Sequence, residues 1–212
     1  MHNAILFDLD GTLVDSLGFY LQAHQKTLKG YNIRLTPAEI VRNCFGVTEQ
    51  AIADKFGLTL EQFRAKYLGN VRSFMKHVRL FPHALEILNL AKDNGIKLAV
   101  MSFAYSWYVN EILSLLKIRD YFQSILGFND VTKPKPDPEI VLKSCEILGV
   151  APQGSLSIGD AKSDITMGKA AGTRTALFIP KQNSVFYDFA DLKQTDPDFV
   201  IEDLGELRKL IN

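Results

Sequence analysis

Short apolar runs alternate with amphipathic helical patterns along most of this chain. The first run, Ala4–Phe7, has four apolar residues in succession, which is typical of a strand buried on both faces of a parallel sheet. Similar short strands are expected at residues 96–101, 124–128, 156–158 and 175–179. Helical patterns separate these runs, so the connections should be right-handed crossovers. The sequence therefore predicts a parallel sheet with helices on both faces.

Residues 16–80 interrupt this alternation, because they carry helical patterns and no convincing strand. Thr36 and Thr59 each begin a capping box, a pattern that marks the start of a helix. We therefore expect two domains. The first is an α/β, Rossmann-like core of residues 1–15 and 81–212, and the second is an inserted, all-helical cap of residues 16–80.

The overall composition is that of an ordinary globular protein, with 47% apolar and 23% charged residues. The 24 basic and 24 acidic residues balance, which gives no electrostatic reason to expect nucleic acid or an anionic membrane as a partner. No secretion signal is recognisable, and no apolar run approaches the ~18 residues of a membrane span. We expect a cytoplasmic protein, a monomer or weak homodimer, that acts on a small anionic substrate rather than a polyanion. Cys44 and Cys145 form no metal-binding pattern and are expected to be buried.

Polar residues follow several of the predicted strands. Asp8 and Asp10 come directly after the first strand, in the string DLDGTLVDS. Burying an unpaired carboxylate costs several kcal/mol, so this pair needs a cation or dense hydrogen bonding. Ser102 follows a second strand, and the string GDAKSD places Asp160 and Asp164 after another. The carboxyl ends of parallel strands share one edge, where we expect these groups to meet.

These strings resemble the motifs of the haloacid dehalogenase superfamily, a group dominated by magnesium-dependent phosphatases. The helical insertion is similar to the cap of its phosphoglycolate phosphatase-like subgroup. DLDGTLVDS matches the first motif and Ser102 the second, while TKPKPDP and GDAKSD match the third and fourth. The resemblance implies that Asp8 is a nucleophile and that Asp10 is a general acid and base. It also implies that Ser102 and Lys133 bind the phosphate group.

The third motif contains two lysines, each of which precedes a proline. The family places its lysine before the first proline, so the resemblance selects Lys133 and leaves Lys135 as a solvated lysine of the loop.

The resemblance also implies a bound Mg²⁺, for which oxygen ligands are suitable. Its expected ligands are Asp8, Asp160 and the main-chain carbonyl of Asp10. Asp164 is expected to hydrogen-bond backbone amides or the lysine instead.

The implied reaction is hydrolysis of a small phosphate monoester, similar to phosphoglycolate, through an aspartyl phosphate. The presence of Asp10 disfavours dehalogenation, because a departing halide needs no proton.

Sugar phosphomutases of the same superfamily are the main alternative. They carry a cap histidine and an arginine in a Gly-Val-Ser-Arg string, where this chain has Tyr20 or His24 and ends the string with Glu49. An acid at that position would repel phosphate. A non-catalytic phosphate-binding module is a further alternative, but it would be expected to lack one of the motif residues.

Substrate specificity is expected to depend on side chains outside the motifs. The cap offers four candidates, Tyr20, His24, Arg42 and Lys76. Aromatic residues after Ser102 could contact a leaving group or simply pack, and packing is the expectation for Phe103, Tyr105, Trp107 and Tyr108.

Overall fold

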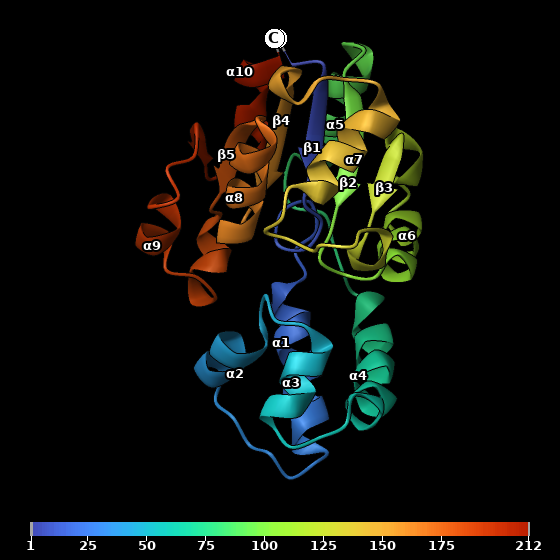
Figure 1. Cartoon of the computed structure of the whole chain (residues 1–212), viewed down its shortest axis with the longest axis vertical. Helices are drawn as coiled ribbons and strands as arrows, with labels where there is room; N and C mark the ends of the chain where they lie inside the picture. The colour runs from blue at the N-terminus through green and yellow to red at the C-terminus, as the bar shows by residue number, and fades with distance from the viewer. Residues whose placement is uncertain (1, 212) are drawn as a thin grey trace. The chain divides into compact units, whose positions relative to one another are not determined.

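The computed structural model describes residues 2–211 and divides into two compact units (Figure 1). The core unit comprises Met1–Asp15 and Arg79–Asn212, and the helical unit comprises Ser16–Val78. Among the described residues, no helix has both the length and the apolar composition that crossing a membrane requires.

The core unit resumes at Arg79 rather than at the predicted residue 81. Local pairing explains the difference, because Leu80 forms an antiparallel bridge with Val14. In addition, the Asp15 N–H donates to the Arg79 carbonyl at 2.9 Å. These contacts hold Arg79 and Leu80 beside Val14 and Asp15, the last residues of the first core segment.

Within residues 2–211 the core unit contains one six-stranded sheet in the order β3-β2-β1-β4-β5-β6, with every neighbouring pair parallel. The predicted Rossmann-like α/β fold is therefore confirmed. The strands are β1 (Ala4–Phe7), β2 (Lys97–Met101), β3 (Ser124–Leu126), β4 (Ser155–Gly159), β5 (Arg174–Phe178) and β6 (Phe199–Ile201). The central strand β1 is completely buried, because helices cover both faces of the sheet.

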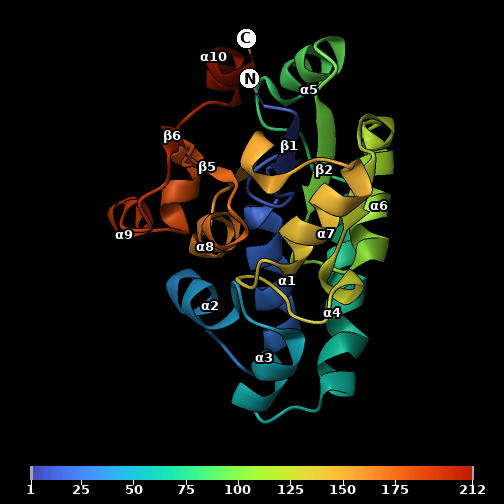
Figure 2. The same ribbon diagram turned by 45° about the horizontal axis from the view of Figure 1, so that its top comes forward.

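Helices α7 and α8 pack on one face of the sheet, and right-handed crossovers place α5 and α6 on the other (Figures 1 and 2). Apolar residues of α7 and α8 share a buried cluster with alternate residues of β1 and β2. The helices of this unit are α5 (Ala84–Asp93), α6 (Ser106–Leu115), α7 (Glu139–Leu148), α8 (Lys162–Ala171), α9 (Phe189–Lys193) and α10 (Arg208–Ile211). Short 3-10 turns are η1 (Arg119–Tyr121), η2 (Phe128–Asp130), η3 (Pro152–Gly154), η4 (Lys181–Val185) and η5 (Leu204–Leu207).

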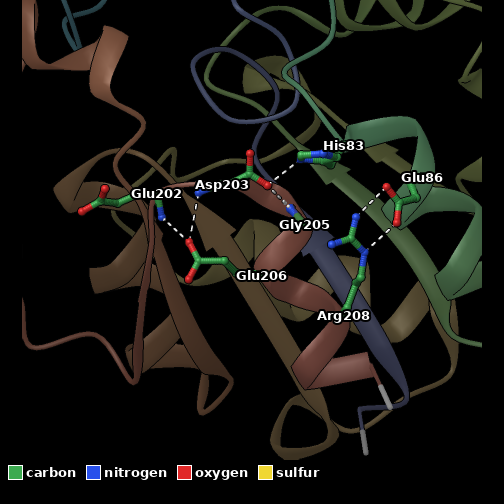
Figure 3. A network of polar contacts seen from close by, with 7 residues as sticks. All are labelled: His83, Glu86, Glu202, Asp203, Gly205, Glu206 and Arg208. Atoms are coloured by element: carbon green, nitrogen blue, oxygen red, sulfur yellow. Dashed lines mark hydrogen bonds and ion pairs between the residues drawn. The ribbon is translucent and has the colours of Figure 1, made fainter.

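Polar contacts attach the C-terminal segment to the start of α5 (Figure 3). Arg208 binds Glu86 through two parallel hydrogen bonds of 2.6 and 2.7 Å. His83 Nδ1 lies 2.6 Å from Asp203 Oδ1, which also accepts the Gly205 N–H. Exposed pairs of this kind add little stability, but they fix where η5 and α10 lie against α5.

The helical unit consists of α1 (Leu17–Lys29), α2 (Pro37–Cys44), α3 (Glu49–Lys55) and α4 (Leu60–Met75). Both predicted capping boxes are present, at Thr36 and at Thr59. The residues of α4 that face the core of this unit recur at every fourth position, as on one face of an amphipathic helix; they are Phe63, Tyr67, Val71 and Met75.

Candidate active site

A buried lysine lies at the carboxyl edge of the sheet, beside the ends of β1 and β2 and the first turn of α8. The Nζ atom of Lys135 donates to Asp8 Oδ1 at 2.6 Å, to Asp164 Oδ1 at 2.7 Å and to the Met101 carbonyl at 2.9 Å. Its side chain is only 3% exposed. Burial alone would lower the pKa of Lys135, but the charges of Asp164 and Asp8 raise it above its ordinary value. The ammonium group is therefore charged and shared between two carboxylates.

The prediction that Lys133 is the lysine beside Asp8 is wrong. Lys133 is exposed, and its backbone N–H donates to the Glu139 side chain at 2.8 Å. Glu139 also accepts the Thr132 N–H at 2.8 Å. Glu139 thereby anchors the first part of the loop at the start of α7, and Lys135, two positions further on, enters the core.

Asp160, at the end of β4, is held by groups from two other segments. The Thr12 hydroxyl donates to Asp160 Oδ1 at 3.1 Å, and Asn183 Nδ2 lies 3.4 Å from Oδ2. The turn at Gly11 also approaches this carboxylate closely. Gly11 has a φ of +87°, and a Cβ atom there would lie 2.2 Å from Asp160 Oδ2. Only glycine allows both this backbone conformation and this approach.

The three buried acids carry more negative charge than the lysine can neutralise. Oxygen atoms of Asp8, Asp160 and Asp164 all lie within 4.8 Å of one another. Burial raises the pKa of Asp8 to about 7, although Lys135 opposes the shift. Burial, together with the charges of Asp8 and Asp164, raises the pKa of Asp160 well above its ordinary value. An oxygen-ligated divalent cation fits this donor set, because it would supply the missing positive charge.

The remaining motif residues lie at the same edge of the sheet. Ser102 follows β2, is buried, and accepts the Ala104 N–H at 3.0 Å through its Oγ atom. Asp164 Oδ2 accepts the Ala161 N–H at 3.0 Å, while its other oxygen accepts from Lys135. Gly159 makes room for this side chain, since a Cβ atom at Gly159 would lie 2.3 Å from the Asp164 Cβ.

Asp10 has a partner that the sequence did not reveal. The hydroxyl of Tyr108, on α6, donates to Asp10 Oδ1 at 3.0 Å. Tyr108 is buried, as expected for packing, but it also reaches the site. Its position six residues after Ser102 was the only sequence signal, and this signal applied equally to the neighbouring aromatic residues.

Asn183, in η4, is a second site residue that sequence reasoning missed. Its Nδ2 atom donates to the Gly11 carbonyl at 3.0 Å as well as approaching Asp160. Its Oδ1 atom is buried and has no hydrogen-bond partner among the described residues. Burial and the charge of Asp160 raise the pKa of Tyr187, a little further along, well above its ordinary value. The segment after β5 therefore helps to hold the Asp160 carboxylate, although nothing in its sequence resembles a motif.

His24 and Glu49 both make contacts within the helical unit. His24 is buried and stacks on Tyr67 and Phe63, with ring centroids 4.6 and 6.2 Å away. Burial lowers the pKa of His24 to about 3, so the imidazole is neutral at pH 7. Glu49 pairs with Arg64 at 2.5 Å. His24 is thus a core residue of this unit, and the position that holds the mutase arginine carries an acid with its own partner.

Comparison with known proteins agrees with this arrangement. A family model described as haloacid dehalogenase-like hydrolase matches residues 5–178. A phosphoglycolate phosphatase from Aquifex aeolicus is 36% identical, over 98% of this chain and 96% of its own length. Pyrophosphatase PpaX from Oceanobacillus iheyensis is 30% identical, over 98% of this chain and 95% of its own length.

The fold is also found in solved structures. The crystal structure of a protein described as a predicted phosphoglycolate phosphatase from Haemophilus somnus superposes with a TM-score of 0.87. It is 23% identical and the match covers 100% of this chain and 98% of the other. The family match spans most of the chain, from the second residue of β1 to the end of β5, and includes the acids and the lysine that follow these strands. This chain belongs to the haloacid dehalogenase-like hydrolases.

Proposed function

We propose that this protein is a magnesium-dependent phosphatase that hydrolyses a small phosphate monoester through an aspartyl phosphate on Asp8. The observation that carries the proposal is the pairing of a buried Asp8 carboxylate with Lys135, in contact range of two further acids. The ammonium group of Lys135 can balance negative charge while the Asp8 carboxylate receives a phosphoryl group.

In the first step, an Asp8 oxygen attacks phosphorus in line with the ester oxygen. The bond between phosphorus and the ester oxygen breaks, and Asp10 gives its proton to the departing alkoxide. Lys135 opposes the effect of burial on the pKa of Asp8, because an ammonium favours the charged form of a neighbouring carboxylate. The Ser102 hydroxyl, which follows β2, would donate to a phosphate oxygen.

In the second step, water attacks the phosphorus atom of the aspartyl phosphate. Asp10, now a carboxylate, accepts a proton from that water, and the bond between phosphorus and the Asp8 oxygen breaks. Inorganic phosphate leaves, and Asp8 returns to its starting state. Asp10 therefore recovers in the second step the proton that it gave away in the first.

Asp8, Asp160 and the carbonyl of Asp10 would hold the Mg²⁺. The ion would stabilise negative charge on the phosphoryl group during transfer. Asp164 is engaged by Lys135 and by the Ala161 N–H, so its role is to orient the lysine.

Phosphoglycolate is the first substrate to test, because the relative from Aquifex aeolicus carries that name and covers the same length. Pyrophosphate is the second, for the same reason in the relative from Oceanobacillus iheyensis. Mutase activity is less well supported, since Glu49 occupies the place of the phosphate-binding arginine and His24 lies in a core.

The test is release of inorganic phosphate from 4-nitrophenyl phosphate, phosphoglycolate and pyrophosphate, with Mg²⁺ and with EDTA, on the wild type and on Asp8→Asn. We expect turnover only with Mg²⁺ and only in the wild type. Asp8→Asn should remain folded, because Lys135 keeps Asp164 as its partner. Near-normal turnover by a folded Asp8→Asn protein would refute the assignment of the nucleophile.

A further inference from the structure

Tyr108 connects helix α6 to the loop after β1. Its phenol oxygen donates to Asp10 Oδ1 at 3.0 Å, across 98 residues of sequence. Tyr108 is 2% exposed, and its ring packs edge-on against Trp107, with centroids 6.0 Å apart. A buried tyrosine hydroxyl usually finds a polar partner. Here that partner is the carboxyl group that the proposed reaction needs as its acid.

The first turn of α6 is firmly attached, so the Tyr108 hydroxyl has a defined position. Asn129, in η2, accepts from both the Ser106 N–H and the Ser106 hydroxyl, at 2.8 and 3.0 Å. The Phe128 N–H also donates to the Ala104 carbonyl at 2.8 Å. Because the backbone around Ser106 is fixed in this way, the ring two residues later can direct its hydroxyl at one point.

We propose that Tyr108 is a positioning residue that holds the Asp10 carboxyl in the orientation needed for proton transfer to the leaving oxygen. The inference rests on the proposed function, in which Asp10 is that acid. The Tyr108 hydroxyl is one of the contacts that hold this carboxyl, and it donates to Oδ1. Loss of the hydroxyl would loosen the χ2 angle of Asp10, so that fewer of its orientations would present its proton to the substrate.

A purely structural role for the hydroxyl makes a different prediction. If it only satisfied a buried polar group, its loss would affect all substrates equally. A role in proton transfer depends on the leaving group. An alkoxide is a strong base and needs a proton as it departs, whereas 4-nitrophenolate is a weak base and departs without one.

The experiment compares kcat/KM for phosphoglycolate and for 4-nitrophenyl phosphate in the wild type and in Tyr108→Phe. This ratio reports the steps up to the first phosphoryl transfer. General acid catalysis contributes 10²–10⁴-fold, so a loss of orientation should lower kcat/KM for the alkyl ester by about tenfold. The value for 4-nitrophenyl phosphate should change by less than about twofold. An equal change for both substrates, or no change for either, would overturn the proposal.

Tyr121→Phe is the matched control. It also removes a tyrosine hydroxyl, but one that lies at the protein surface and donates to Asn89 at 2.6 Å. It should leave kcat/KM unchanged for both substrates. Asp10→Ala provides a second test that does not depend on the folding of Tyr108→Phe. It should show the same preference for the aryl ester more strongly, and adding Tyr108→Phe to it should have no further effect. An additive effect in the double variant would contradict action through Asp10.

If the proposed function itself is wrong, the experiments give a different result. In that case the wild type would lack magnesium-dependent turnover of every ester, or Asp8→Asn would retain it. Either finding would also remove the role assigned to Tyr108. A different result would overturn the Tyr108 proposal alone. In that case the wild type would be active and Asp8→Asn inactive, but Tyr108→Phe would change kcat/KM equally for both substrates.

Discussion

The Nζ atom of Lys135 lies 2.6 Å from Oδ1 of Asp8, and neither side chain is more than 9% exposed. The two residues are 127 positions apart in the sequence, and they meet because the third-motif loop and β1 end at the same edge of the sheet. The lysine also binds Asp164. A single ammonium group therefore fixes the proposed nucleophile relative to the start of α8.

Replacing Lys135 should be costly for both stability and activity. Lys135→Met would leave two buried carboxylates without their cation, which typically costs about 3–5 kcal/mol of unfolding free energy. We expect the folded fraction of the variant to lose turnover by at least about 10²-fold, since a charged group near the phosphoryl oxygens is removed. Denaturant unfolding and phosphate release measure the two effects.

Lys133→Met is the control for that experiment. Lys133 is exposed, so the same substitution should leave stability and turnover close to wild type. The opposite pattern, an inactive Lys133→Met and an active Lys135→Met, would favour the motif position predicted from sequence.

Asp160→Asn should separate metal binding from folding. In metal-free protein the substitution removes a buried charge that Asp8 and Asp164 repel, so it should cost little or no stability. In the wild type, Mg²⁺ should raise the midpoint of thermal unfolding, because a cation that binds only the folded state stabilises it. The variant should lose this increase. An equal response to Mg²⁺ in both proteins would exclude Asp160 as a ligand.

Asn183 should affect metal affinity more than maximal rate. Asn183→Ala removes the link between Asp160 and the Gly11 carbonyl, while the Thr12 hydroxyl remains. Partners that orient a metal ligand commonly contribute 10–100-fold in affinity. Because the Thr12 hydroxyl still holds Asp160 in the variant, we expect a loss of about tenfold. Calorimetric titration with Mg²⁺ measures the change. Asn94→Ala, which alters the exposed end of α5, should bind Mg²⁺ as the wild type does.

His24 should make the stability of the protein depend on pH. Its pKa falls from 6.5 to about 3 in the folded protein because the ring is buried. Between these two values the unfolded chain binds a proton that the folded protein does not, so stability falls as the pH is lowered. The slope from this one residue is up to about 1.4 kcal/mol per pH unit, and above pH 6.5 the effect is absent.

Substituting the ring measures that contribution directly. His24→Phe should flatten the dependence of unfolding free energy on pH between pH 6 and pH 4, by roughly the slope of one proton. His77→Gln, at an exposed histidine of the same unit, should retain the wild-type slope. If both variants keep the wild-type slope, the His24 ring is accessible to protons in the folded state.

Local sequence patterns determined the fold and much of the candidate site. Apolar runs and helical spacing report which residues face a core, and Thr36 and Thr59 mark helix starts through bonds to residues only three positions away. Asp8, Asp160 and Asp164 were also predictable as neighbours. They follow strands, and a parallel sheet brings strand ends to one edge whatever the sequence between them.

Only the tertiary structure decided between the two lysines of TKPKPDP. Each precedes a proline, and local propensity does not distinguish them. The choice depends on Glu139, which fixes the Thr132 and Lys133 amides and leaves Lys135 to enter the core. The contacts of Tyr108 and Asn183 have the same origin. They join groups 98 and 172 residues apart. Their hydrogen bonds depend on the angles and distances at which packed elements meet, and a local sequence pattern does not predict these.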